Sequence, residues 1–256
     1  MAINVNTVYT SVLSILNKEQ RGYLTPYEFN QLATQVQLEI FESYFENLNQ
    51  QLRAPENNSE YADRVKMLQE KISTFETSTT ASVAIVDGLG QFDFSVLPAN
   101  TPAVHRFGRI DYTEGSKLPV EIDKVTRQEF LTFRRSPLTA PSTDYPICYI
   151  EGTTIKILPA RKATAAGADG SPARTYTLEY VKKPIDPVWN YTVGSVGQYI
   201  FDPVANGVSK DFEISDLDQT EVILKILMYA GVVIRDPEIV QQAAQAVAAQ
   251  DQLEQI

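Results

Sequence analysis

Apolar residues recur at helical spacing through most of residues 8–75, which predicts three helices in the first third of the chain. The first helix should end near Gly22. The second should begin at Thr25-Pro26-Tyr27-Glu28, because this motif joins a capping box to a proline at the first helical position. Its apolar stripe continues to about Arg53, and the third helix should occupy residues 59–75.

The pattern changes to short, strand-like apolar runs between residues 77 and 201. Glycines separate several of these runs, as expected for hairpins. One short helix interrupts them, since Thr126-Arg127-Gln128-Glu129 is a second capping box that leads into Phe130–Arg134. We therefore expect a compact β module, either a sandwich or a barrel. The candidate strands are residues 82–86, 91–96, 106–112, 120–125, 146–151, 154–158, 176–182 and 198–201.

Helical spacing returns at the end of the chain. Asp218-Gln219-Thr220-Glu221 can cap a helix that is apolar on almost every face through Val233, and neighbours must cover such a helix. Asp236-Pro237-Glu238 marks a new helix start or a kink. The last helix should reach about Leu253, and its many alanines allow another helix to approach closely.

These patterns together predict an α+β fold. The N-terminal helices (residues 1–76) and the C-terminal helices (residues 216–256) should complete one bundle, because neither group can cover its own apolar faces. The antiparallel β module (residues 77–215) would then be inserted between them. The chain shows no internal repeat, so any symmetry must come from several copies.

Charge is distributed unevenly along the 256 residues, whose formal net charge is −10. Residues 1–102 carry 6 basic and 12 acidic side chains, residues 103–185 carry 13 and 9, and residues 186–256 carry 3 and 11. An acidic total argues against general binding to nucleic acid. In an assembly, the basic middle of one subunit could face the acidic helices of another and fix their register.

The sequence also argues against a disulfide-bonded, a secreted and a membrane-spanning protein. One cysteine cannot form an internal disulfide, and this fits assembly in a reducing compartment. The first sixteen residues lack a basic start and a continuous apolar block, so we expect no signal peptide. No run reaches the roughly 18 apolar residues that a membrane span needs.

Residues suited to catalysis are scarce. His105 is the one histidine and lacks an obvious partner, and Cys148 lies in an apolar strand where a small core side chain is expected. Asp216 and Asp218 resemble part of a calcium loop, but we interpret them as acids at a helix start. Gly88-Leu89-Gly90 lacks the third glycine of a dinucleotide-binding loop, the segment 194–197 matches such a loop still less, and the sequence contains no P-loop motif. We therefore predict no catalytic, cofactor-binding or metal-binding residues, and no enzyme.

The basic side chains and the aromatic side chains can each be interpreted in two ways. Arg134, Arg135, Lys182 and Lys183 are the strongest candidate basic contact points, either for a polyanion or as rims of ion pairs. The 13 tyrosines and Trp189 could bind a sugar, but core and interface packing explains them as well.

Three segments resemble virion proteins of crAss-like and related short-tailed bacteriophages. They are Asn17-Lys18-Glu19-Gln20-Arg21-Gly22-Tyr23-Leu24-Thr25-Pro26, Tyr145-Pro146-Ile147 with Leu158-Pro159, and Leu178-Glu179-Tyr180-Val181-Lys182-Lys183-Pro184. The predicted architecture also resembles head–tail adaptors of the tail tubular protein A type. The resemblance implies a subunit of a closed ring, commonly a dodecamer, between portal and tail and around the DNA channel. It implies no catalytic residue.

The expected function is therefore that of a structural ring protein in the head–tail connector. Its partners would be its own copies, the portal protein and other neck or tail rings, with genomic DNA passing through without sequence-specific binding. We expect it in the tail or neck of the virion, assembled in the host bacterial cytoplasm, with no membrane contact. The alternative is a phage surface-binding module that recognises a host glycan through the β domain. The candidate subunit-interface residues are Phe41, Phe45, Ala243, Ala244, Val247 and Ala248.

Overall fold

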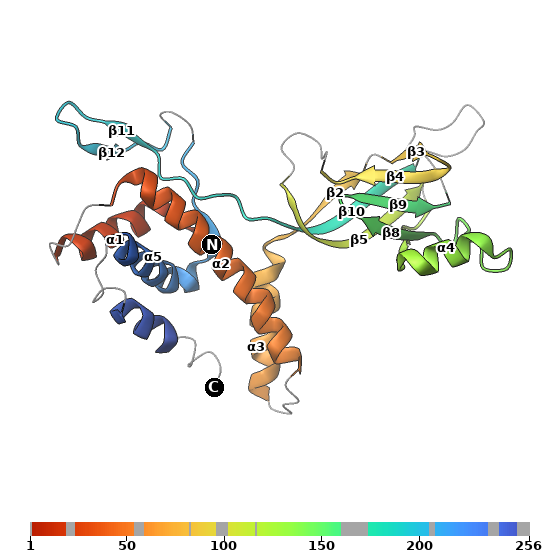
Figure 1. Cartoon of the computed structure of the whole chain (residues 1–256), viewed down its shortest axis with the longest axis horizontal. Helices are drawn as coiled ribbons and strands as arrows, with labels where there is room; N and C mark the ends of the chain where they lie inside the picture. The colour runs from red at the N-terminus through yellow and green to blue at the C-terminus, as the bar shows by residue number, and fades with distance from the viewer. Residues whose placement is uncertain are drawn as a thin grey trace. The chain divides into compact units, whose positions relative to one another are not determined.

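The chain forms two compact units, with helices gathered in one and a β fold in the other (Figure 1). Unit 1 contains Met1–Thr74 and Pro184–Ile256, and unit 2 contains Phe75–Lys183. The predicted α+β class is confirmed. The computed structural model describes residues 2–18, 24–53, 59–81, 83–95, 102–115, 117–159, 174–204, 208–234 and 241–249.

The helices of unit 1 come from both ends of the chain. The second helix begins where its motif predicts, because the Thr25 N–H donates to the Glu28 carboxylate at 2.9 Å and the Glu28 N–H donates to the Thr25 hydroxyl at 3.3 Å. Residues 241–249 form a further helical segment, and the rest of the predicted last helix lies outside the described residues. The principal helices are α1 (Val5–Lys18), α2 (Pro26–Arg53), α3 (Ser59–Ser73) and α5 (Gln219–Ile234).

Helix α5 lies against α1 and α2 and is buried along most of its described length, as its apolar sequence predicts. Its one basic residue, Lys225, is also buried, and it forms ion pairs of 3.1 Å with both Glu221 and Glu39. Two carboxylates therefore compensate the burial of one ammonium group.

The short helix η1 (Asp216–Asp218) precedes α5, so both acids lie at a helix start, as the sequence predicts. Asp218 is buried and accepts hydrogen bonds from the Tyr44 hydroxyl and from Lys71 Nζ, the latter at 2.9 Å. Asp218 therefore also joins α2 and α3 to the start of α5, a contact that the sequence did not predict.

The predicted boundary at residue 215 differs from the compact units, because residues 184–215 belong to unit 1. Strand β13 (Phe212–Ser215) pairs with β1 (Ala2–Ile3) at the N-terminus. The hairpin of β11 (Tyr191–Val193) and β12 (Tyr199–Phe201) also belongs to this unit. The sequence pattern missed β1, β11 and β13 because each is only two to four residues long.

Unit 2 is a sandwich of two sheets, which decides between the two predicted β architectures. The sheets share one apolar core, and the chain passes from one to the other at Ile122, between β6 and β7. One pair, β7–β8, is parallel, so the module is not wholly antiparallel. The first sheet has the order β2 (Glu76–Ala81), β10 (Arg174–Lys182), β5 (Val104–Glu114), β6 (Val120–Glu121); the second has β3 (Ala84–Val86), β4 (Leu89–Asp93), β9 (Thr154–Leu158), β8 (Ile147–Glu151), β7 (Asp123–Lys124).

Helix α4 (Arg127–Arg135) covers the outer face of the second sheet. Its capping box is formed by Thr126 and Glu129, as predicted. The ring of Phe130 packs against Tyr149 of β8, with centroids 4.5 Å apart. The second sheet is therefore covered by the first sheet on one face and by α4 on the other.

Candidate interaction surface

The segment that leads from unit 2 back into unit 1 is held along α2 by side-chain amides. Gln37 is buried; its Nε2 donates to the Ile185 carbonyl at 2.7 Å, and its Oε1 accepts from the Glu213 N–H at 3.0 Å. Two helical turns earlier, the Asn30 amide makes a similar pair of bonds with the backbone N–H and C=O of Trp189, at 2.8 and 3.2 Å. These amides bond the backbone of an extended segment, whose Val188 also forms an isolated antiparallel bridge with Lys210.

Trp189 anchors this segment in unit 1. Its indole Nε1 donates to Asn6 Oδ1 at 2.9 Å, and its ring lies 4.1 Å from the Tyr9 ring, centroid to centroid. Tyr191 and Phe201 each lie 5.8 Å from the same ring. The tryptophan therefore belongs to the core of unit 1, and the β11–β12 hairpin is rooted on it.

The β11–β12 hairpin closes through a glycine turn. Register pairs Tyr191 with Phe201 and Val193 with Tyr199. The Gly194 N–H donates to the Gln198 carbonyl at 2.8 Å, and the Gly197 N–H donates to the Gly194 carbonyl at 3.0 Å. Gly197 has a φ of +83°, which fits the left-handed position of a three-residue hairpin loop. The segment 194–197 is thus a hairpin turn and not a phosphate loop.

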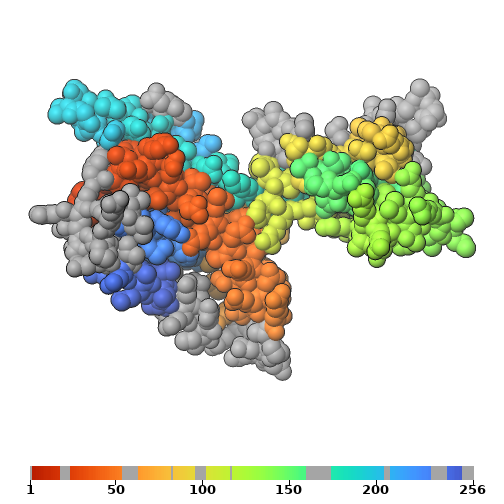
Figure 2. All heavy atoms as spheres, viewed as in Figure 1, coloured from red at the N-terminus to blue at the C-terminus, as the bar shows by residue number. Residues whose placement is uncertain are grey.

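The hairpin exposes apolar side chains and carries no charge. Val196 at the tip is 88% exposed, Val193 is 62% exposed and Ile200 is 48% exposed. No charged residue occurs from Asn190 to Phe201, whereas unit 1 as a whole has 9 basic and 20 acidic residues. Figure 2 shows the hairpin in cyan, standing out from the helices of its unit. Val193 and Ile200 belong to adjacent cross-strand pairs and so project from opposite faces of the hairpin, and a partner would have to cover both faces. In the sequence, this hairpin corresponds to the uncharged, glycine-containing run of residues 190–201, from which only the strand at 198–201 was predicted.

Several predicted interface residues lie in the core, which corrects that prediction. Phe41 is 0% exposed and Phe45 is 8% exposed, and their rings pack edge to face at 5.1 Å. Ala243 is also buried. A second copy cannot contact these side chains, because the chain's own bundle already covers them. Of the rest, Ala244 and Ala248 are exposed and Val247 is half-buried.

The predicted basic contact points are not brought together. Arg134 and Arg135 are exposed at the end of α4, where cations favour the helix terminus. Lys182 and Lys183 stand at the end of β10, and their N–H groups donate to the carbonyls of Phe75 and Ala103, both at 2.8 Å. In Figure 1, α4 and the exit of β10 lie at opposite ends of unit 2. No continuous basic surface follows from these four residues.

The tyrosines of unit 2 are committed to packing. Those at 112, 149, 176 and 180 are each 8% exposed or less. Burial raises the pKa of the phenols at 112, 176 and 180 above the ordinary value. Four of the five tyrosines of unit 2 are therefore core residues. Tyr145, which is 76% exposed, is an exception.

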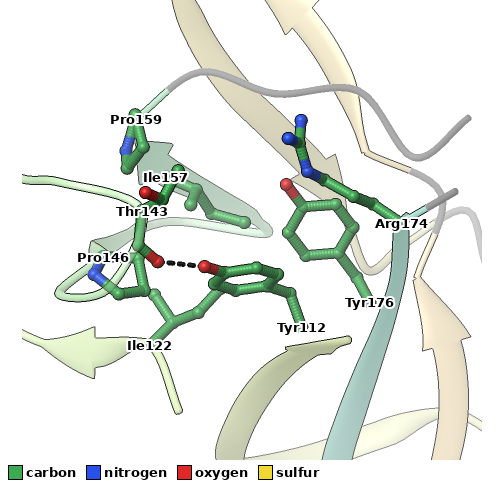
Figure 3. Close-up of a pocket in the computed structure, with 8 residues that line it drawn as sticks. All are labelled: Tyr112, Ile122, Thr143, Pro146, Ile157, Pro159, Arg174 and Tyr176. Carbon is green, nitrogen blue, oxygen red and sulfur yellow. Dashed lines mark hydrogen bonds between the residues drawn. The ribbon is translucent and has the colours of Figure 1, made fainter. Parts of the chain in front are cut away.

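A pocket in unit 2 is too small for a ligand. Tyr112, Arg174 and Tyr176 line it, and the Tyr112 hydroxyl donates to the Thr143 carbonyl (Figure 3). The cavity volume is about 10 Å³, close to the least space that holds one water molecule. Arg174 is also paired with Glu114, the two side chains being 11% and 12% exposed. The pocket is best understood as a packing gap beside an ion pair.

Cys148 is fully buried, and burial raises the pKa of its thiol to about 12, so it has little thiolate character. Across the described ranges, no three His, Cys, Asp or Glu side chains gather closely enough to hold a metal ion. None of the described helices is long and apolar enough to cross a membrane.

No model of a known protein family matches this chain, and no curated protein sequence matches it.

Proposed function

We propose that this protein is a non-enzymatic ring subunit of a phage head–tail connector, in which copies of the chain contact one another and a portal. The observation that carries the proposal is the exposed, uncharged β11–β12 hairpin on an otherwise acidic unit. Exposed apolar ribbons are unfavourable on a solitary protein, and a partner that covers this one would stabilise it.

The charge of unit 1 supports the same function. Its net charge is −11, counted over all its residues. Carboxylates repel the phosphates of DNA, so an acidic ring wall would let genomic DNA slide without sticking. In this proposal the DNA passes through the ring, and the protein does not bind it sequence-specifically.

The test is a mass measurement of the purified chain, alone and mixed with the portal of the same phage. We expect a closed multimer in the mixture, because ring closure can depend on the neighbouring layer. A chain that stays solitary in both samples, and is absent from the genome-exit vertex of whole particles, would overturn the proposal.

A matched pair of variants separates the hairpin from general surface effects. Val196→Asp adds a charge at a tip residue that is 88% exposed, and Leu118→Asp adds one in unit 2 at a residue that is 85% exposed. Neither change disturbs a core. We expect Val196→Asp to reduce multimer formation and Leu118→Asp to leave it intact.

A further inference from the structure

Among the residues that the structure describes, each unit has a sheet edge whose strand carries no charged side chain, proline or bulge. Natural edge strands are commonly blocked by charged side chains, prolines or bulges. Strand β3 forms one edge of the second sheet of unit 2, and β12 belongs to a two-stranded sheet of unit 1. Residues 77–86 and 190–201 contain no charged residue and no proline.

At the free edge of β3, the backbone hydrogen-bonding groups of Ile85 point outward, away from β4. Asp87 and Gly88 form the turn to β4, with φ values of +52° and +74°, as a type I′ turn requires. The pair next to such a turn, Val86 and Leu89, is the hydrogen-bonded one, so the following pair, Ile85 and Gly90, is not. The backbone N–H and C=O of Ile85 therefore point away from β4. All of β3 is exposed, with Ile85 at 41%.

At the free edge of β12, the backbone hydrogen-bonding groups of Phe201 point outward. The reason is again that hydrogen-bonded and non-hydrogen-bonded residue pairs alternate along an antiparallel ladder. The bond from the Gly194 N–H to the Gln198 carbonyl fixes one hydrogen-bonded pair. From this pair, hydrogen-bonded and non-hydrogen-bonded pairs alternate along β11 and β12, so the pair of Tyr191 and Phe201 is not hydrogen-bonded. The bond from the Asp202 N–H to the Asn190 carbonyl, at 3.1 Å, agrees with this pattern. The backbone N–H and C=O of Phe201 therefore point away from β11, beside the half-exposed Ile200.

We propose that β12 of one copy pairs with β3 of the next copy, extending the second sheet of unit 2 across the subunit boundary. This inference rests on the proposed function, because it requires copies in contact. Each subunit would use two different edges, which is a heterologous contact, and such contacts form a ring when the rotation between successive copies closes. Backbone hydrogen bonds would provide affinity, as in other cases of strand addition.

The charge distribution favours a second copy of this chain as the occupant. Each copy carries a net charge of −10, so two copies repel unless their contact avoids carboxylates. Both edges meet this condition, since neither run of residues contains an acid. A basic partner would gain nothing from such neutral edges.

Cross-linking in the portal-containing assembly tests the pairing. Ile85→Cys and Ile200→Cys are made singly and together, and a short bismaleimide is added; Cys148 is fully buried and serves as an unreactive background. We expect dimers only when the two single variants are mixed, and a ladder of multimers from the double variant.

Dimers from Ile200→Cys alone would indicate a two-fold contact between hairpins and overturn the proposal. Cross-links to the portal instead of the chain would also overturn it.

Proline substitution tests the backbone contact. Ile85→Pro removes an outward N–H without removing a bond to β4, and Ile85→Thr keeps that N–H with a strand-forming side chain. We expect the proline variant to associate about tenfold more weakly and the threonine variant to form the multimer. Circular dichroism checks that both variants are folded.

The outcomes separate the two proposals. A closed multimer without the 85–200 cross-link, and with the proline variant still assembling, overturns the strand pairing and leaves the ring function standing. The absence of any multimer by mass, with or without portal, overturns both.

Discussion

Trp189 and Asn6 are joined by a hydrogen bond of 2.9 Å across 183 positions of sequence. The bond connects helix α1 to the segment that carries the β11–β12 hairpin. Because the Trp189 ring also packs on Tyr9 and Tyr191, the hairpin is attached to the first helix through one side chain. The position of the candidate interaction surface therefore depends on residues at the opposite end of the chain.

Asn6→Ala should destabilise unit 1 by about 1–3 kcal/mol, because the buried indole N–H would lose its acceptor. Trp189 is the one tryptophan of the chain, so its fluorescence during urea unfolding reports the change directly. Asn17→Ala is the matched control, since Asn17 is exposed on the same helix. Equal unfolding midpoints for the two variants would contradict the assigned role of Asn6.

Gln37→Ala should cost about 2–3 kcal/mol, because one buried amide bonds both the Ile185 carbonyl and the Glu213 N–H. Hydrogen exchange at the Glu213 amide should accelerate as its acceptor is removed. Gln35→Ala, at an exposed position of the same helix, should leave both the stability and that exchange rate nearly unchanged. If the two glutamine variants behave alike, the amide does not hold the segment.

Local motifs explain which parts of the fold could be predicted. The start of α2 depends on Thr25 and Glu28, and the start of α4 depends on Thr126 and Glu129; each pair is three residues apart in sequence. The glycines between apolar runs predicted the hairpin of β3 and β4, whose turn residues Asp87 and Gly88 are adjacent in sequence. Such interactions are complete within one turn, so the sequence alone carries them.

The remaining features depend on partners that are distant in sequence. The sequence does not distinguish Gln37 from a surface glutamine, because the Ile185 carbonyl that it bonds is far away in sequence. It places Asp218 correctly at a helix start but does not show the bonds from Tyr44 and Lys71. For the same reason the apolar stripe of α2 could not reveal whether Phe41 faces a neighbour helix or a second copy. Of the exposed hairpin, the sequence predicted the strand near residues 198–201 but not β11, since a three-residue strand leaves almost no periodicity.

The capping box of α2 predicts a pH dependence. Hydrogen bonds from the Thr25 hydroxyl and N–H lower the pKa of the Glu28 carboxyl below its ordinary value of 4.5. The ionised group therefore stabilises the folded state above that pH, and this contribution is lost as pH falls through the lower folded pKa.

Glu28→Gln should remove this part of the acid sensitivity, because glutamine keeps the acceptor of the capping box but does not titrate. Unfolding free energies measured from pH 6 down to about pH 3 should fall less steeply in the variant than in the wild type. In a second measurement, Thr25→Ala should raise the pKa of Glu28 in an NMR titration. A titration that Thr25→Ala leaves unmoved would show that the capping box is not formed.

The thiol of Cys148 should resist alkylation in the folded protein. The thiolate is the reactive form, and burial raises the pKa of this thiol to about 12, so at pH 8 only about one thiol in ten thousand is ionised. The surrounding sheet also excludes the reagent, since the side chain is 0% exposed in the core between the two sheets. Iodoacetamide followed by mass measurement should show almost no modification of native protein and complete modification in urea. Rapid native labelling would mean that unit 2 opens, because the thiol cannot react from within the core. That outcome would also require a Cys148→Ala background in the cross-linking of Ile85→Cys and Ile200→Cys.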